Sequence, residues 1–277
     1  MVSPGGTPLK KRAQEAADEL RSRLSAPPWL GLLLGTGHAS ITAQLKKRVQ
    51  LPPQELPGGM RLADESHLVF GELDGVPVVV GDAPLAPYEG WGSFEVTFPV
   101  RVLAALGVEL LVLTAGAASL SRHLEPGTVA VIEDHLNFTN LHPLQGPYDA
   151  SLGPRFPDMS NPYPARWRRL ARDVGSEVGM SCLEAVFAAV PGPSLPTRAE
   201  YRFLRRAGAD LVGMSLVPEV VTAVHAGLDV LALVGITQLV HVESEQAADI
   251  EEMLDAADLA APRMASLLSG VVSRFRS

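Results

Sequence analysis

Two short segments rich in glycine and hydroxyl-bearing residues follow apolar stretches of the chain. Residues 35–40 read Gly-Thr-Gly-His-Ala-Ser after the apolar residues 29–34, and residues 114–119 read Thr-Ala-Gly-Ala-Ala-Ser after the apolar run 110–113. Small residues at the carboxyl end of a buried strand leave backbone N–H groups accessible to a ligand. We therefore expect residues 114–119 to form a loop at the floor of a site; a tight turn whose small residues serve packing alone is the alternative.

The first of these segments has the features of an anion site. A helical pattern continues from it through Val49, so a strand, a Gly-Thr-Gly turn and a helix N-terminus follow one another. The free N–H groups and the dipole at the start of a helix attract negative charge. Glycine-bearing turns also occur after many strands without any ligand, so an ordinary connection is the alternative for residues 35–40.

The elements that would position these segments alternate along the chain. Helical spacing of apolar residues predicts helices over 8–24, 96–106, 164–178, 198–207, 215–226 and 248–274. Apolar runs predict strands over 29–34, 67–73, 76–80, 110–113, 128–132, 185–190, 210–214 and 230–236, and Asp74-Gly75 indicates a hairpin between the second and third. Two proline-rich segments, 81–90 and 134–164, are expected to be irregular. The alternation predicts a single α/β domain with a central mixed, mostly parallel sheet flanked by helices.

Composition excludes several classes of partner. The chain has 277 residues with 23 basic and 31 acidic side chains, and a net charge of -8 argues against a nucleic acid. Its single cysteine, Cys182, cannot form an internal disulfide, and no cluster of His, Cys and carboxylates has the spacing of a metal site, so we expect no metal. No apolar run approaches the roughly 20 residues of a membrane helix, so we expect no membrane partner. The N-terminus lacks the apolar core of a signal peptide, and the expected location is cytoplasmic.

Several motifs in register resemble the trimeric purine nucleoside phosphorylase family, the nucleoside phosphorylases of class 2. They lie at residues 88–90, 96–102, 134–137, 142–147, 153–160, 192–194 and 208–215, and the resemblance covers about residues 8–275. In that family phosphate attacks the anomeric carbon of a purine nucleoside and releases the base and ribose 1-phosphate. The resemblance implies one nucleoside phosphorylase-like domain over residues 1–277, with inorganic phosphate as co-substrate and no other cofactor. It also implies a homotrimer in which Phe156 enters the neighbouring subunit's site.

Site residues follow from the resemblance by position. Thr36, Gly116 and Ser215 match the family's phosphate ligands, and a threonine hydroxyl can make the bond of the serine that the family has at the first position. Tyr88 and Met214 match residues that line the ribose. The ligand implied is therefore a purine nucleoside or a close analogue.

At other positions the chain departs from the family's pattern. Pro84 and Ala86 stand where the family has an arginine and a histidine on phosphate, and neither can carry charge or donate a side-chain hydrogen bond. Leu195 and Pro196 replace an aromatic residue and the purine-binding glutamate, and Gln238 replaces the asparagine that contacts the purine. Because both phosphate and the leaving base lose polar partners, the departures predict weak or altered phosphorolysis.

Two residues are candidates to compensate for these losses. His38 could supply a cation in the phosphate loop, and Glu243 could replace the missing glutamate; for each, an exposed loop residue is the alternative. Two hypotheses about function follow. The chain is a pentosyltransferase of the purine nucleoside phosphorylase type, active in purine salvage with altered activity, or it is a non-catalytic homologue that binds a nucleoside-like ligand or acts through its oligomer.

Overall fold

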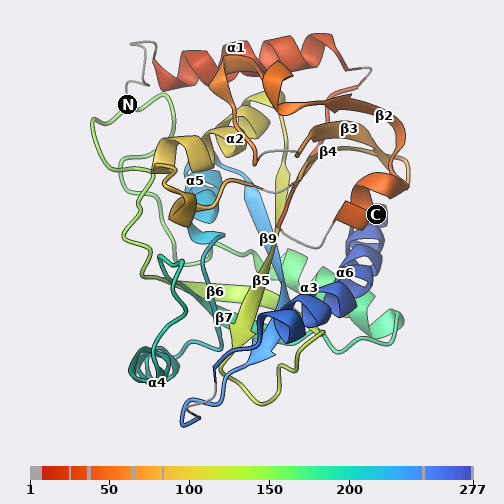
Figure 1. The fold of residues 1–277 in the computed structure, drawn as a ribbon. Helices are drawn as coiled ribbons and strands as arrows, with labels where there is room; N and C mark the ends of the chain where they lie inside the picture. The colour runs from red at the N-terminus through yellow and green to blue at the C-terminus, as the bar shows by residue number, and fades with distance from the viewer. Residues whose placement is uncertain are drawn as a thin grey trace.

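A computed structural model describes residues 8–24, 26–35, 39–63, 66–82, 84–244 and 247–275. In these ranges a nine-stranded sheet is packed between helices (Figure 1). The strands are β1 (Leu30–Leu34), β2 (Lys46–Leu51), β3 (Leu68–Leu73), β4 (Val76–Asp82), β5 (Leu110–Ser119), β6 (Val129–Asn137), β7 (Glu184–Ala189), β8 (Leu211–Gly213) and β9 (Asp229–Leu239). The α-helices are α1 (Leu9–Ser22), α2 (Ser93–Leu106), α3 (Ala165–Glu177), α4 (Arg198–Arg206), α5 (Val217–Ala226) and α6 (Ile250–Ser273). Short 3-10 helices are η1 (Ala39–Gln44), η2 (Pro53–Glu55), η3 (Pro57–Gly59) and η4 (Pro87–Glu89).

The sheet is open at one side and closed into a ring at the other. Its order is β2-β3-β4-β1-β5-β8-β7-β6-β9, and β9 pairs again with β5, so the last five strands form a closed ring. The pairs β1–β4, β1–β5, β5–β9, β6–β7 and β7–β8 are parallel, whereas β2–β3, β3–β4, β5–β8 and β6–β9 are antiparallel. The predicted α/β domain with a mixed, mostly parallel sheet is confirmed.

Strand β5 belongs to both parts of the sheet, and its sequence explains why. Leu111 and Leu113 pack into the core beside α1, α2 and α5, while Leu110 and Val112 pack into a second core beside α3 and α6. A strand that is apolar on both faces is covered by helices on both sides. Figure 1 shows α1 and α2 together on one side of the molecule and α3 and α6 together on the other. Among the described residues, no helix is long and apolar enough to cross a membrane.

The prediction of a helix that continues from residues 35–40 through Val49 is wrong. The six-residue helix η1 is followed by β2, which pairs antiparallel with β3, so that Val49 lies opposite Phe70. The hairpin of β3 and β4, confirmed at Asp74-Gly75, offers a free edge whose N–H and C=O groups β2 satisfies. This long-range pairing outweighs the helical spacing of residues 39–49, and no long helix begins at residue 39 to supply a dipole for an anion.

The loop expected over residues 114–119 is also wrong, because these residues continue β5. They pair with β9 along their whole length, and Ala118 and Ser119 pair with β8 as well. One of these small residues serves close approach between strands, since a Cβ on Gly116 would lie 3.1 Å from Thr237 Cγ2 of β9. Gly116 is nevertheless exposed, whereas the rest of β5 is buried.

A buried acid lies in the first turn of α5. Glu219 is 3% exposed, its Oε2 has no hydrogen-bond partner among the described residues, and burial raises its pKa to about 7. Its charge acts on the fully buried Tyr163, whose hydroxyl lies 3.0 Å from His135 Nδ1. The unfolded chain ionises this carboxyl above its ordinary pKa of 4.5, so stability falls as the pH rises from about 4.5 to about 7 and is constant above that.

Replacement of the buried acid tests this assignment. Glu219→Gln removes the ionisable group and keeps its shape. The unfolding midpoint of the variant minus that of the unchanged protein is therefore expected to be larger at pH 8 than at pH 5. The shift in pKa corresponds to as much as about 3 kcal/mol. Thermal unfolding of both proteins at the two pH values measures the difference. An equal difference at pH 5 and pH 8 would contradict it.

Candidate functional site

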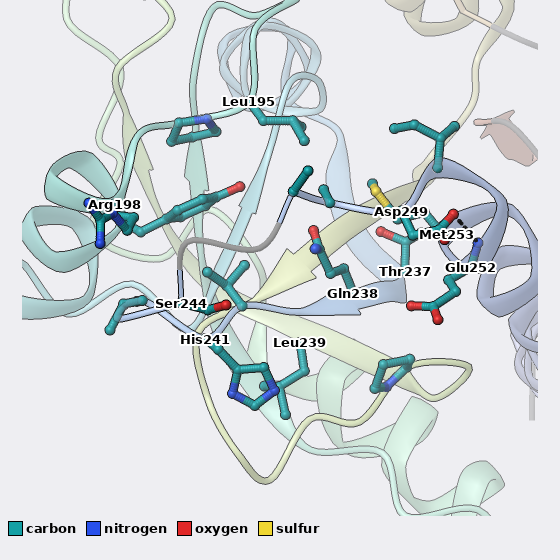
Figure 2. Close-up of a pocket in the computed structure, with 18 of the residues that line it drawn as sticks. Leu195, Arg198, Thr237, Gln238, Leu239, His241, Ser244, Asp249, Glu252 and Met253 are labelled. Atoms are coloured by element: carbon teal, nitrogen blue, oxygen red, sulfur yellow. Dashed lines mark hydrogen bonds between the residues drawn. The ribbon is translucent and has the colours of Figure 1, made fainter.

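A cavity of about 1200 Å³ opens where three parts of the chain meet. Its walls are the carboxyl-terminal part of β9 with residues 240–242 and 244, the start of α4 with the residues before it, and the first turn of α6 with residues 247–249. Figure 2 shows Arg198 at one end, Asp249, Glu252 and Met253 at the other, and Gln238 between them. The cavity therefore brings the start of α4 together with the end of β9 and the start of α6, which follow it in the chain.

A β-bulge aims Gln238 into this cavity. In the pairing of β5 with β9, Ala117 lies opposite Ile236 and Ala118 opposite Gln238, so Thr237 is an extra residue. Thr237 is held in place because its hydroxyl donates to the carbonyl oxygen of Ala117 at 3.1 Å. An extra residue bends a strand and changes the side to which the following side chains point. The bulge thus interrupts the apolar series of β9 at the position where the cavity begins.

Gln238 lines the cavity and carries an unsatisfied acceptor. Its Oε1 is buried and has no hydrogen-bond partner among the described residues. Figure 2 shows the amide turned away from Glu252, toward the side of the cavity where Leu195 lies. A buried acceptor without a donor costs about 1–3 kcal/mol, so a ligand that supplies an N–H or O–H group there gains a comparable amount.

The wall opposite β9 is formed by Leu195 and Pro196. Leu195 is 39% exposed, and neither side chain offers a hydrogen-bond donor or acceptor. The structure thus brings the predicted nucleoside-binding residues Leu195 and Gln238 into one cavity. Polar recognition between these two walls depends on Gln238 of β9 rather than on a carboxylate.

Of the predicted phosphate ligands, Gly116 lies in the second half of β5 and Ser215 follows β8. A Cβ on Gly116 would lie 3.1 Å from Thr237 Cγ2, which places Gly116 beside the cavity lining. Gly35 donates its backbone N–H to both the carbonyl and the hydroxyl oxygen of Thr114, each at 3.1 Å. The chain therefore leaves β1 beside Thr114, which precedes Gly116 by two residues in β5. Thr36 and His38 lie outside the described residues.

Ser215 and Met214 follow β8 directly and are both partly buried. A Cβ on Gly192 would overlap Met214 Sδ, so the loop before α4 packs against Met214. The next residue, Leu216, is 3% exposed and has a φ of 76°, an unusual conformation for a branched side chain. The buried leucine fixes the point at which the chain turns from Ser215 into α5.

Other predicted residues stand apart from the cavity lining. Tyr88 on η4 is 47% exposed and Phe156 is 87% exposed. Glu243 points to α4, where it forms an ion pair with Arg202 at 3.4 Å, and it does not line the cavity. Within the described ranges, no group of three or more His, Cys, Asp or Glu side chains could hold a metal ion.

Sequence reasoning missed an acid at the phosphate end. Asp82 ends β4 and lies opposite Leu34, which in turn lies opposite Thr114. Its Oδ1 is buried without a hydrogen-bond partner among the described residues, and burial raises the pKa of the carboxyl. When ionised, this carboxylate opposes an anion bound at the ends of these strands. Asp82 lies two residues beyond the predicted strand 76–80, in the segment expected to be irregular, and no sequence signal marked it.

Sequence reasoning also missed the cavity residues contributed by helices. Glu252 and Met253 come from the first turn of α6, and Tyr201 comes from α4. The helices themselves were predicted, but which face of each meets the cavity depends on how they pack against β9. Helical periodicity alone does not contain this information.

Comparison with known proteins agrees with this geometry. Residues 30–273 match the family model described as the phosphorylase superfamily. The chain is 39% identical over 248 residues to purine nucleoside phosphorylase 1 of Geobacillus stearothermophilus, covering 88% of this chain and 90% of that protein. It is 36% identical over 270 residues to purine nucleoside phosphorylase 1 of Bacillus subtilis (strain 168), covering 96% and 100%. A crystal structure of a Schistosoma purine nucleoside phosphorylase in complex with hypoxanthine superposes with a TM-score of 0.92 at 30% identity, covering 96% and 98%.

The chain belongs to the phosphorylase superfamily and, within it, to the purine nucleoside phosphorylase family. Homologues with that name and solved structures with that fold match it along nearly the whole chain. The resemblance stated from the motifs is confirmed.

A glycine substitution tests whether the loop before α4 positions Met214. Gly192→Ala must move Met214, because Gly192 has a φ of 68° and its added Cβ would overlap the sulfur. Gly179→Ala is the matched control, since Gly179 has a φ of 75° and no atom within 4 Å of an added Cβ. Both variants are expected to lose about 1 kcal/mol of stability from backbone strain. Only Gly192→Ala is expected to weaken nucleoside binding in calorimetry as well; equal affinities in the two variants would refute the role of the loop.

Proposed function

We propose that this protein binds purine nucleosides in the cavity and cleaves them by phosphorolysis at a low rate. The observation that carries the proposal is the buried, unpartnered Oε1 of Gln238 inside a cavity bordered by the predicted phosphate ligand Gly116. A purine base supplies ring and exocyclic N–H groups that suit such an acceptor. The cavity is large enough for a nucleoside.

The proposed reaction follows from this arrangement. Phosphate lies at the ends of β1, β5 and β8, where the backbone N–H of Gly116 and the hydroxyls of Thr36 and Ser215 donate to it. Met214 borders the ribose on the side of the phosphate and the first turn of α6 borders it on the other, and a phosphate oxygen attacks the anomeric carbon as the bond to the base breaks. Gln238 contacts the departing purine, since its amide can also rotate to donate an N–H to a base nitrogen that gains negative charge.

The low rate follows from charge. Pro84 and Ala86 provide no cation at the phosphate end, and the carboxylate of Asp82 adds negative charge there. Loss of a charged ligand to an anion costs a few kcal/mol, or several powers of ten in rate when the leaving-group contact is weakened as well. His38 is the candidate cation that would moderate this loss, and Glu243 is assigned no catalytic role because it pairs with Arg202.

A second function is supported by the same residues. A homologue that binds a nucleoside-like ligand without converting it would keep the residues that line the base, such as Gln238 and Leu195. It would lose the cationic side chains that bind phosphate, as this chain has at Pro84 and Ala86. The two functions differ in whether phosphate and nucleoside act together.

We further propose a homotrimer in the cytoplasm. Phe156 is 87% exposed, a state that is unfavourable for a phenylalanine on an isolated subunit. Arg155 lies over the Phe156 ring, 5.8 Å from its centroid. An exposed aromatic residue of this kind fits insertion into the site of a neighbouring subunit.

The test of function combines binding and product detection. Phosphate, inosine, guanosine and adenosine are added singly and in pairs to the purified protein, and both the unfolding midpoint and the free base are measured. Additional stabilisation by phosphate with a nucleoside, accompanied by base release, supports the enzyme. Stabilisation by nucleosides without any base release supports the binding protein, and no response to any nucleoside contradicts both. Gln238→Leu is expected to weaken nucleoside binding about tenfold, whereas Gln50→Leu on the exposed strand β2 leaves it unchanged.

A gain-of-function variant tests the explanation of the low rate. Ala86→His places an imidazole where the family has a histidine, so phosphorolysis is expected to increase at least about tenfold below pH 6.5, where the ring carries a positive charge. Ala207→His adds the same group at an exposed position after α4 and serves as the control. Initial rates of base release at several phosphate concentrations measure the effect. An unchanged rate in Ala86→His would mean that the missing cation does not limit the reaction.

A further inference from the structure

The cavity is larger than a nucleoside requires. Its volume of about 1200 Å³ exceeds the roughly 300–1000 Å³ of pockets that enclose drug-sized ligands. A purine nucleoside placed with its base at Gln238 leaves part of this space unfilled. The unfilled part must lie toward one end of the cavity, and the lining residues indicate which end.

The end of the cavity at α4 has one apolar, firmly built wall, and Arg198 and Ser244 also line this end. Tyr201, Val240 and Val242 line it and belong to one hydrophobic cluster, in which Tyr201 is only 8% exposed. We call this end of the cavity, lined by Tyr201, Val240 and Val242, the α4 extension. Arg202 holds its outer wall, since the guanidinium donates to the carbonyl oxygen of Val242 at 3.5 Å and pairs with Glu243. An apolar ligand group therefore meets a preformed surface there.

The opposite end has a different character. Asp249 and Glu252 lie there, and Asp249 caps α6 by accepting from the backbone N–H of Glu251 and Glu252. Such a polar end suits the hydroxyl groups of a sugar, which donate hydrogen bonds to carboxylates. A nucleoside whose ribose faces α6 directs the outer edge of its base toward the α4 extension.

Gln238 lies between the two ends and sets a condition on the ligand. Its buried Oε1 requires a donor, and a secondary amine on carbon 6 of the purine keeps one N–H for it. The substituent on that amine then continues past Leu195 and Pro196, which have no polar side-chain groups to exclude it. A 6-oxopurine offers neither this N–H nor a substituent at the same position.

We propose that the cavity selects purine nucleosides whose 6-amino group carries one large apolar or aromatic substituent, that is, N6-alkylated or N6-arylated adenosines. This inference rests on the proposed binding of nucleosides in the same cavity. The amine N–H satisfies Gln238, and the substituent packs against Tyr201, Val240 and Val242.

Four ligands test the inference by titration calorimetry with the full chain. They are inosine, adenosine, N6-benzyladenosine and N6-benzyl-N6-methyladenosine. N6-Benzyladenosine is expected to bind about tenfold more tightly than adenosine, because its phenyl group leaves water. The fourth ligand has the same phenyl group but no N–H, so it is expected to lose most of that gain. Base release from each nucleoside in phosphate is measured in parallel.

Protein variants locate the substituent. Val242→Trp fills the α4 extension and is expected to bring the ratio of affinities for N6-benzyladenosine and adenosine close to one. Val178→Trp adds the same side chain at an exposed position after α3 and is expected to leave the ratio unchanged. Binding of adenosine and inosine with exclusion of the benzyl derivative would overturn the inference while the proposed function stands. Failure of every nucleoside to bind would overturn both.

Discussion

The parallel pairing of β5 with β9 is the constraint on which the rest of the structure depends. It runs from Leu110 opposite Asp229 to Ser119 opposite Leu239 and closes five strands into a ring. The same strand β5 carries the open half of the sheet through its pairing with β1. One irregularity in this pairing, the extra residue Thr237, converts a packing strand into the wall of a cavity. Fold and site therefore depend on a single register.

Strands and the segments between them contribute different groups to the site. Strand ends supply fixed backbone groups, as at Gly116, while the loop before α4 and the start of α6 supply side chains that vary the lining. Small residues occur where strands or loops approach closely, as between Gly213 and Gly116 or between Gly192 and Met214. Among the described residues, polar atoms left without partners on Asp82 and Gln238 mark places where the fold accepts an energetic cost near the site.

Much of the fold could be predicted from the sequence because its signals are local. The apolar run at 110–113 and the turn at Asp74-Gly75 carry enough information to define a buried strand and a hairpin. Strand β2 could not be recognised, because its residues are exposed at five of six positions and adopt the strand only by pairing with β3. The site was accessible mainly through motifs. Leu195 and Gln238, both named from motifs, line one cavity, but the burial of the Gln238 amide depends on the bulge, and the positions of Tyr201 and Glu252 depend on helix packing.

The closed ring also has an evolutionary consequence. A ring leaves none of its strands free to shift along a neighbour, since a change of register in one pair would have to be matched in all five. Diversification of the ligand must then proceed by exchange of side chains at positions such as 195, 196 and 238, with the backbone held constant. A relative with a different specificity can thus share almost the same main-chain path. Sequence and ligand range are therefore expected to diverge faster than the fold.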